Sequence, residues 1–327
     1  MKALNRGAAL LAAMLTVALV ATFAAAALWQ QWRSIEVETA ERARVQSAWV
    51  LTGALDWARL VLREDARAGG ADHLGEPWAV PLQEARLSSF LAADRNATAD
   101  TGPEVLEAFL SGQIVDLQSL LNVNNLVQDG KLSAPDFRGF GRLFDLLGLP
   151  PTELDRMAEN LRFALDTSGS NRSSPMAPLL PQRVEQLVWL GIPAETVEVL
   201  RPYVTVLPMR TQVNLNTARA EVIYAAVDGL SMADAQRLVA ERGRSYFRTV
   251  ADAKRAIGAG DAMFAEGQAG VGVASRFFEV RSRLRLDQLV VEERALVQRD
   301  GFEVRTLQRQ RSAPDTAALA QPQAPKR

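Results

Sequence analysis

The stretch RGAALLAAMLTVALVATFAAAAL, from Arg6 to Leu28, decides the architecture of this chain. Residues 8–28 carry no charge, and a helix needs about 20 such residues to cross the hydrocarbon core of a bilayer. Because Lys2 and Arg6 precede the apolar run, the positive-inside rule keeps the N-terminus in the cytoplasm and sends the rest of the chain outward. The sequence therefore predicts one membrane-spanning segment at its start.

Three interpretations of this segment stay open on these residues alone. It is a plain membrane anchor, a secretory signal cut at Ala24-Ala25-Ala26, or the start of a mature chain released from a short basic leader after Gly7. Between residues 8 and 68 there is no proline, and Gly53 is the only glycine, so one helix of about 90 Å at roughly 1.5 Å per residue is expected. A membrane helix that continues unbroken beyond the bilayer favours a pilin-like stalk.

Beyond the membrane, the predicted helix has one apolar face. We expect this stripe, together with Ala12 inside the membrane, to pack against the stalk helices of neighbouring subunits. The residues of the stripe recur at steps of three and four: Ala48, Leu51, Leu55, Ala58 and Leu62.

The leader and several later motifs resemble one protein family. Residues 6–11 look like a class III prepilin processing site, with cleavage after Gly7 and Ala8 as the new N-terminus. Most pilin-like proteins carry a glutamate at the fifth mature position, which is Ala12 here. The further motifs are DHLGEPWA at Asp72–Ala79, IVDLQ at Ile114–Gln118, NVNNL at Asn122–Leu126 and VNLNTA at Val213–Ala218. Together they resemble the K subunit of type II secretion systems, a minor pseudopilin, from the leader to about residue 286.

This resemblance implies an α+β, type IV pilin-like fold. A long N-terminal transmembrane and stalk helix would pack on a small antiparallel sheet, and a large inserted α-domain would hold two SAM-like, helix-hairpin-helix-like subdomains. The expected divisions are a prepilin leader (1–7), the transmembrane (8–28) and periplasmic (29–68) parts of the stalk helix, the first part of the sheet region (69–124), the first (125–205) and second (206–272) helical subdomains, the C-terminal strands (273–311) and a disordered tail (312–327).

The residues themselves support this order of helices and strands. Thr152 and Asp155 have capping-box spacing and predict a helix start. Apolar and charged residues alternate in Phe278–Leu286, which predicts a strand with one buried and one basic face. Leu289–Gln298 and Phe302–Gln308, joined by Asp300-Gly301, predict a hairpin.

The resemblance also implies a function and a location. The chain would be cut by the prepilin peptidase after Gly7, methylated on Ala8, and held as a single-pass protein of the inner membrane, with its N-terminus in the cytoplasm and its body in the periplasm. It would join the I and J minor pseudopilins at the tip of a pseudopilus built from the major pseudopilin, and would start assembly of that pseudopilus for export across the outer membrane. In pilin-like proteins the glutamate at this position is thought to engage a neighbouring subunit. A tip subunit has no subunit above it to recruit, so Ala12 suits a subunit at the tip. Neither catalysis nor a nucleic-acid partner is expected.

Composition argues against most cofactor sites. There is no cysteine, which excludes disulfides, thiolate zinc sites and iron–sulfur clusters, and His73 is the single histidine. We therefore interpret Asp72, His73 and Glu76 as a structural turn. Relatives associate calcium with a carboxylate-rich loop, but the corresponding stretch here, residues 163–172, keeps only Asp166. Calcium needs six to eight oxygen ligands, so it is not carried over, and no cofactor is expected.

Two alternative functions come from other classes of protein. Residues 218–242 have the shape of a helix-hairpin-helix, which would suit a membrane-anchored DNA-binding protein. Its turn, however, carries Asp228 before Gly229, and a carboxylate there repels phosphate. The formal net charge of −1 also argues against general nucleic-acid binding. The other alternative is an exported soluble protein whose first 26 residues are only a signal.

Overall fold

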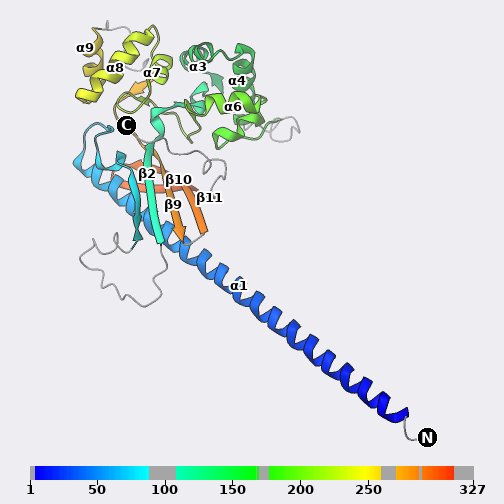
Figure 1. Cartoon of the computed structure of the whole chain (residues 1–327). Helices are drawn as coiled ribbons and strands as arrows, with labels where there is room; N and C mark the ends of the chain where they lie inside the picture. Colours follow the sequence, from blue (N-terminus) through cyan, green and yellow to red (C-terminus); the bar gives the residue numbers. More distant parts are fainter. Residues whose placement is uncertain are drawn as a thin grey trace.

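The computed structural model describes residues 4–87, 108–166, 168, 177–258, 270–286 and 289–312. One long helix forms a stalk that ends in a body made of an antiparallel sheet and a helical lobe (Figure 1). The sheet lies along the last part of the helix, and the lobe lies at the end of the body away from the N-terminus. Of the predicted disordered tail, 312–327, Ser312 is the last residue of a strand, and the residues from 313 onward lie outside the described residues.

Helix α1 (Leu4–Ala68) forms the whole stalk. Among the described residues, it is the one helix that is long and apolar enough to cross a membrane, with a window of mean hydropathy 2.3 between Ala8 and Ala68. The helix ends at Gly69 and Gly70, whose φ angles of 66° and 115° are accessible to glycine at little cost. The chain then turns back into the body.

The sheet has five strands in the order β1-β2-β9-β10-β11, and all neighbours are antiparallel. The strands are β1 (Leu82–Arg86), β2 (Ala108–Asp116), β9 (Phe277–Leu286), β10 (Leu289–Asp300) and β11 (Glu303–Ser312). Along β9 the even-numbered residues are buried and the arginines lie on the other face, which confirms the predicted alternation. The predicted hairpin at Asp300-Gly301 is also confirmed, because it joins β10 to β11.

The inner face of the sheet packs on α1. Leu55, Ala58 and Leu62 form one core cluster with side chains from four strands and from the 3₁₀ helix η1 (Pro77–Ala79). The partners of the three helix residues are Trp78, Ile114, Phe278, Val280, Ala295, Val297 and Val304. This cluster ties the stalk to the body.

The predicted contact of the apolar stripe with neighbouring stalks is wrong for most of its residues. Leu51, Leu55, Ala58 and Leu62 are at most 4% exposed within this single chain. Because the chain's own body covers these side chains, they are not available to another subunit. Of the other two predicted contacts, Ala48 is half-buried and Ala12 is exposed on the apolar N-terminal part of α1.

The helical lobe is inserted between β2 and β9. The first unit holds η2 (Leu117–Ser119), β3 (Leu121–Asn122), η3 (Val123–Leu126), β4 (Val127–Gln128), β5 (Lys131–Leu132), α3 (Ala134–Leu147), α4 (Pro151–Leu165), η4 (Val184–Leu190), α6 (Ala194–Leu200) and β6 (Val204–Thr205). The second holds β7 (Val213–Asn214), α7 (Ala220–Ala226), α8 (Met232–Arg244), α9 (Val250–Ile257) and β8 (Val271–Gly272). Their apolar side chains form one continuous core, so the lobe is a single packed body.

One helix start differs from its prediction. Helix α4 begins at Pro151, and Pro150 precedes it without a side-chain cap. Proline fixes φ near the helical value and lacks the N–H that the first turn would leave unpaired, so it starts a helix without a capping hydroxyl. Thr152 therefore lies inside the first turn of α4.

Candidate functional site: the polar junction between stalk, sheet and lobe

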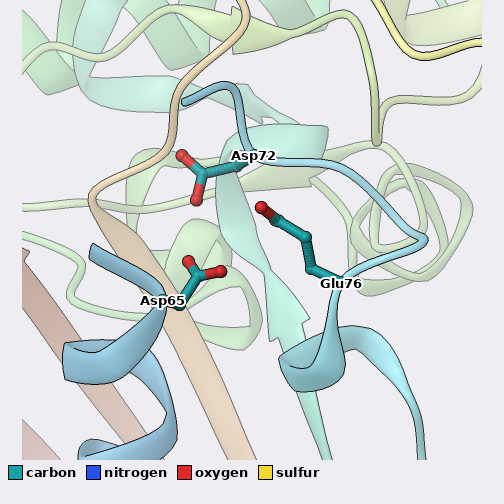
Figure 2. A group of neighbouring side chains, drawn as sticks. All are labelled: Asp65, Asp72 and Glu76. Atoms are coloured by element: carbon teal, nitrogen blue, oxygen red, sulfur yellow. The ribbon is translucent and has the colours of Figure 1, made fainter. Parts of the chain in front are cut away.

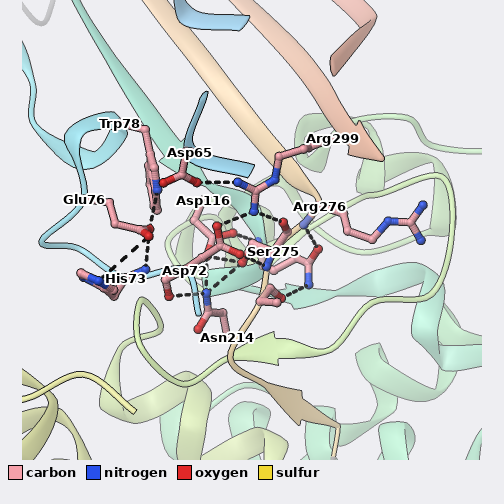
Figure 3. Close-up of polar contacts among 12 residues, drawn as sticks. Asp65, Asp72, His73, Glu76, Trp78, Asp116, Asn214, Ser275, Arg276 and Arg299 are labelled. Carbon is pink, nitrogen blue, oxygen red and sulfur yellow. Dashed lines mark hydrogen bonds and ion pairs between the residues drawn. The ribbon is translucent and has the colours of Figure 1, made fainter. Parts of the chain in front are cut away.

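A buried polar cluster joins the stalk, the sheet and the lobe (Figure 3). Asp65 comes from the last turn of α1, Asp72 from the loop that follows it, and Asp116 from the end of β2. The lobe contributes Asn214 on β7 and Thr217 just after it. The linker before β9 contributes Ser275, and the end of β10 contributes Arg299. We call these seven residues the polar junction.

Arg299 holds two carboxylates of the polar junction. Its Nη1 donates to Asp65 at 2.6 Å, and its Nη2 donates to Asp72 and to the carbonyl oxygen of Ser275, the latter at 2.8 Å. The side chains of Arg299, Asp65 and Asp72 are only 10%, 9% and 5% exposed. Since Asp65 and Asp72 flank the glycine break, this one guanidinium fixes the direction in which the chain leaves the stalk.

Asp116 lies at the centre of the polar junction and is 3% exposed. One carboxylate oxygen accepts from the backbone N–H of Gln118 at 2.8 Å. The other accepts from Thr217 Oγ1 at 2.6 Å, Ser275 Oγ at 2.7 Å and Asn214 Nδ2 at 3.2 Å. Burial raises the pKa of Asp116 to about 6, although these donors pull it down.

Asp72 connects the loop after α1 to the linker before β9. Its Oδ2 accepts from the backbone N–H of Ser275 at 2.6 Å, and its carbonyl oxygen accepts from Asn214 Nδ2 at 3.1 Å. Burial raises the pKa of Asp72, and the adjacent Arg299 opposes this rise. The stalk end, the sheet and the second unit of the lobe are therefore linked through a few shared polar groups.

The turn at Asp72–Ala79 docks beside the polar junction. Glu76 Oε2 accepts from the backbone N–H of His73 at 2.9 Å and from Trp78 Nε1 at 2.7 Å, and burial raises the pKa of Glu76 to about 7. The ring of His73 stacks on Tyr246 of the lobe, with ring centroids 3.8 Å apart. Trp78 is 2% exposed and packs edge-on against Phe278. These contacts are those of a structural turn.

Three carboxylates of this region could be considered as metal ligands. Figure 2 shows Asp65, Asp72 and Glu76 pointing toward one another, and their oxygens lie within 4.8 Å. The Arg299 guanidinium already pairs with two of the three, so a cation would have to displace a charged group of the same sign. The donor set does not fit a metal site.

The predicted processing and calcium residues lie elsewhere. Gly7 and Ala8 are in the first turns of α1, and Ala8 is exposed. Asp166 follows α4, is exposed, and accepts from the backbone N–H of Ser168 at 2.9 Å. The rest of the stretch after Asp166, up to residue 176, lies outside the described residues apart from Ser168.

Sequence reasoning found only part of the polar junction. Asp72, Asp116, Asn214 and Thr217 all lie inside the quoted motifs, and the structure brings those motifs together at one point. Asp65, Ser275 and Arg299 were missed. Asp65 and Arg299 are 234 positions apart, and no local pattern links two residues at that separation.

The fold is that of a pilin-like protein, with one N-terminal helix that is long and apolar enough for a membrane anchor and with a helical lobe inserted between two strands of its sheet. Two family models, both described as type II secretion system protein K, match residues 119–209 and 213–273. Both matched segments lie in the helical lobe, and there the chain is similar to this family.

Individual relatives agree with the family models. The chain is 28% identical to type II secretion system protein K of Pseudomonas aeruginosa, over 86% of this chain and 85% of the relative. It is 24% identical to protein K of Pectobacterium carotovorum, over 95% and 97%. A chain of the GspK-GspI-GspJ complex from the enterotoxigenic Escherichia coli secretion system has the same fold, with a TM-score of 0.65, 19% identity, and coverage of 84% of this chain and 99% of that chain.

Proposed function

We propose that this chain is the tip subunit of a pseudopilus. It assembles with the I and J minor pseudopilins, starts addition of the major pseudopilin, and so supports protein export across the outer membrane without catalysis of its own. The E. coli relative of the same fold was solved in complex with I and J proteins, which supports this choice of partners. The prepilin peptidase would cut the precursor after Gly7 and methylate Ala8 in the inner membrane, leaving the body in the periplasm.

One observation carries the proposal, namely an exposed apolar face on the stalk beyond the membrane. Val45, Trp49 and Leu60 are 54%, 74% and 42% exposed, and Gly53 between them has no atom within 4 Å of where a Cβ would lie. At 100° per residue these positions share one face of α1, roughly opposite the stripe that the sheet buries. A large apolar face on a helix in water marks an interaction surface.

Two further features support placement at the tip. The lobe lies at the end of the body away from the membrane anchor, where it would obstruct a subunit added above (Figure 1). Ala12 puts no carboxylate into the membrane part of α1, so the chain lacks the charged group with which a pilin-like subunit would engage a neighbour.

The test is copurification from membranes. Tagged full-length chain should bring down the I and J pseudopilins of the same organism, and Trp49→Glu should reduce their recovery by about tenfold, because it places a charge in an apolar contact. Trp189→Glu is the matched control, since Trp189 is 41% exposed on the lobe, away from the stalk. If the unmodified chain recovers neither I nor J, the proposed function is wrong.

The contacts of the lobe do not favour DNA binding. Asp228, in the turn of the helix-hairpin-helix, pairs with Arg142 of α3 at 2.8 Å and with Arg138 at 3.3 Å. Arg242 donates to the carbonyl oxygens of Leu215 and Ala218 inside the lobe. The turn that would meet phosphate is therefore engaged by the first unit.

A further inference from the structure

A cleft of about 180 Å³ lies between the outer face of the sheet and the first unit of the lobe. Two arginines come from the lobe, Arg183 before η4 and Arg201 after α6. Two more come from the sheet, Arg281 on β9 and Arg294 on β10. Apolar side chains, among them Val206 and Leu296, line the cleft between these groups. We call it the arginine cleft.

Positive charge in the arginine cleft is not fully neutralised. Arg281 and Arg294 are register partners on neighbouring strands, and like charges in directly opposed positions destabilise a sheet. Arg281 pairs with Glu279, and Arg201 pairs with Glu198 and lies 3.8 Å from Glu185. In the part of the chain that the structure describes, Arg294 has no carboxylate partner.

Arg183 is the second arginine of the cleft without a carboxylate partner among the described residues. Its Nη1 donates to the amide oxygen of Gln310 at 2.6 Å, across the cleft from the lobe to β11. Its Nε is buried and has no acceptor. A buried donor without a partner is unfavourable, so the fold gains no stability from this arrangement. A carboxylate from outside would supply the counter-charge that the guanidinium lacks.

The shape and lining of the cleft narrow the class of ligand. A small inorganic anion would use the arginines but not the apolar surface of Val206 and Leu296. A flat protein surface would not enter the space between the sheet and the lobe. An extended chain segment whose carboxylates alternate with aliphatic side chains would use both kinds of group, because successive side chains of an extended chain point to opposite sides.

We infer that the arginine cleft binds an acidic, extended segment of a partner protein. The cleft lies on the sheet face away from α1, because Arg281 alternates with the inward-facing Val280 and Ser282 along β9. A partner in the cleft and a neighbouring stalk on α1 would therefore occupy different faces of the body. The inference is thus independent of the proposed assembly through the stalk.

The experiment measures binding of a labelled peptide of alternating glutamate and leucine to the full-length chain in detergent, by fluorescence anisotropy. Arg281→Glu combined with Arg294→Glu should weaken binding by at least about tenfold, and raising NaCl from about 50 to about 300 mM should weaken binding to the unmodified chain similarly. Arg244→Glu combined with Arg305→Glu is the matched control, because both are exposed arginines outside the cleft.

Several outcomes would overturn the inference. The cleft variant and the control variant could bind the glutamate–leucine peptide equally well. A lysine–leucine or a glutamate–serine peptide could bind the unmodified chain as tightly as the glutamate–leucine peptide does. Sulfate could displace the peptide at the peptide's own concentration. Should the double variant fold poorly, Arg294→Ala provides the test, since Arg294 is exposed and its loss breaks no ion pair among the described residues. It should weaken binding about threefold without lowering the urea unfolding midpoint, because the change removes a like-charge pair from the sheet.

Discussion

Asp116 accepts hydrogen bonds from four groups in the interior, and its burial governs its proton affinity. The raised pKa, about 6 against 3.8 for an exposed aspartate, means that the folded chain binds this proton more tightly than the unfolded chain. The resulting stabilisation is complete below pH 4 and is lost as the pH rises through about 6. Glu76 acts in the same direction, up to about pH 7.

Asp116→Asn should therefore flatten the pH dependence of stability, because an amide does not titrate. Between about pH 4 and pH 7, the free energy of unfolding of the variant should rise relative to that of the unmodified chain. The rise should be at most about 3 kcal/mol, which corresponds to a pKa shift of about two units. The measurement is urea unfolding followed by tryptophan fluorescence across this range. Parallel curves for the two proteins would show that Asp116 does not hold a proton in the fold.

Arg299→Ala tests the polar junction at a second residue. It leaves Asp65 and Asp72 buried without their counter-charge, and breaking a buried ion pair in this way costs about 3–5 kcal/mol. Arg305→Ala, which removes an exposed pair with Glu303, should leave the unfolding midpoint almost unchanged, because water and salt screen such a pair. Similar unfolding midpoints for the two variants would mean that the polar junction contributes little to stability.

At the scale of single elements, α1 has two apolar faces with different roles. The sheet covers Leu55, whereas Trp49 is exposed on the roughly opposite face. Leu55→Ala should destabilise the body by about 2–5 kcal/mol, and Trp49→Ala should change stability by less than about 0.5 kcal/mol. Thermal unfolding followed by circular dichroism measures both. A strong effect of Trp49→Ala would place that side chain inside the fold.

The sequence predicts the apolar periodicity of α1 but not the surface that covers it. Leu51 and Leu55 would look the same whether they packed on their own sheet or on another subunit, because both surfaces exclude water from the same side chains. The strand β9 was predictable because alternation needs only local information. Arg299 was not, since its partners Asp65 and Asp72 come close only when the whole body has folded.

At the scale of the whole molecule, the N-terminal residue of the purified protein distinguishes prepilin processing from the two alternative interpretations of the apolar segment. Mass spectrometry of membrane-purified protein should find a chain that begins at Ala8 and carries one added methyl group. A chain that begins at Ala27 in the soluble fraction would mean an ordinary secretory signal. An intact Met1 would mean an uncut anchor and would contradict prepilin processing.

The chain enters and leaves the lobe at one place. Asp116, at the end of β2, is the register partner of Phe278 on β9, and the side chain of Gln118 bonds both Gln212 and Arg276. Topologically, the lobe is one cassette inserted into a hairpin that closes without it. Replacing residues 119–274 with a short glycine-rich turn should leave a chain that keeps α1 and the five-stranded sheet, and its circular dichroism signal should still show a cooperative transition on heating. In evolutionary terms, a plain pilin-like subunit could have acquired the whole lobe in a single event.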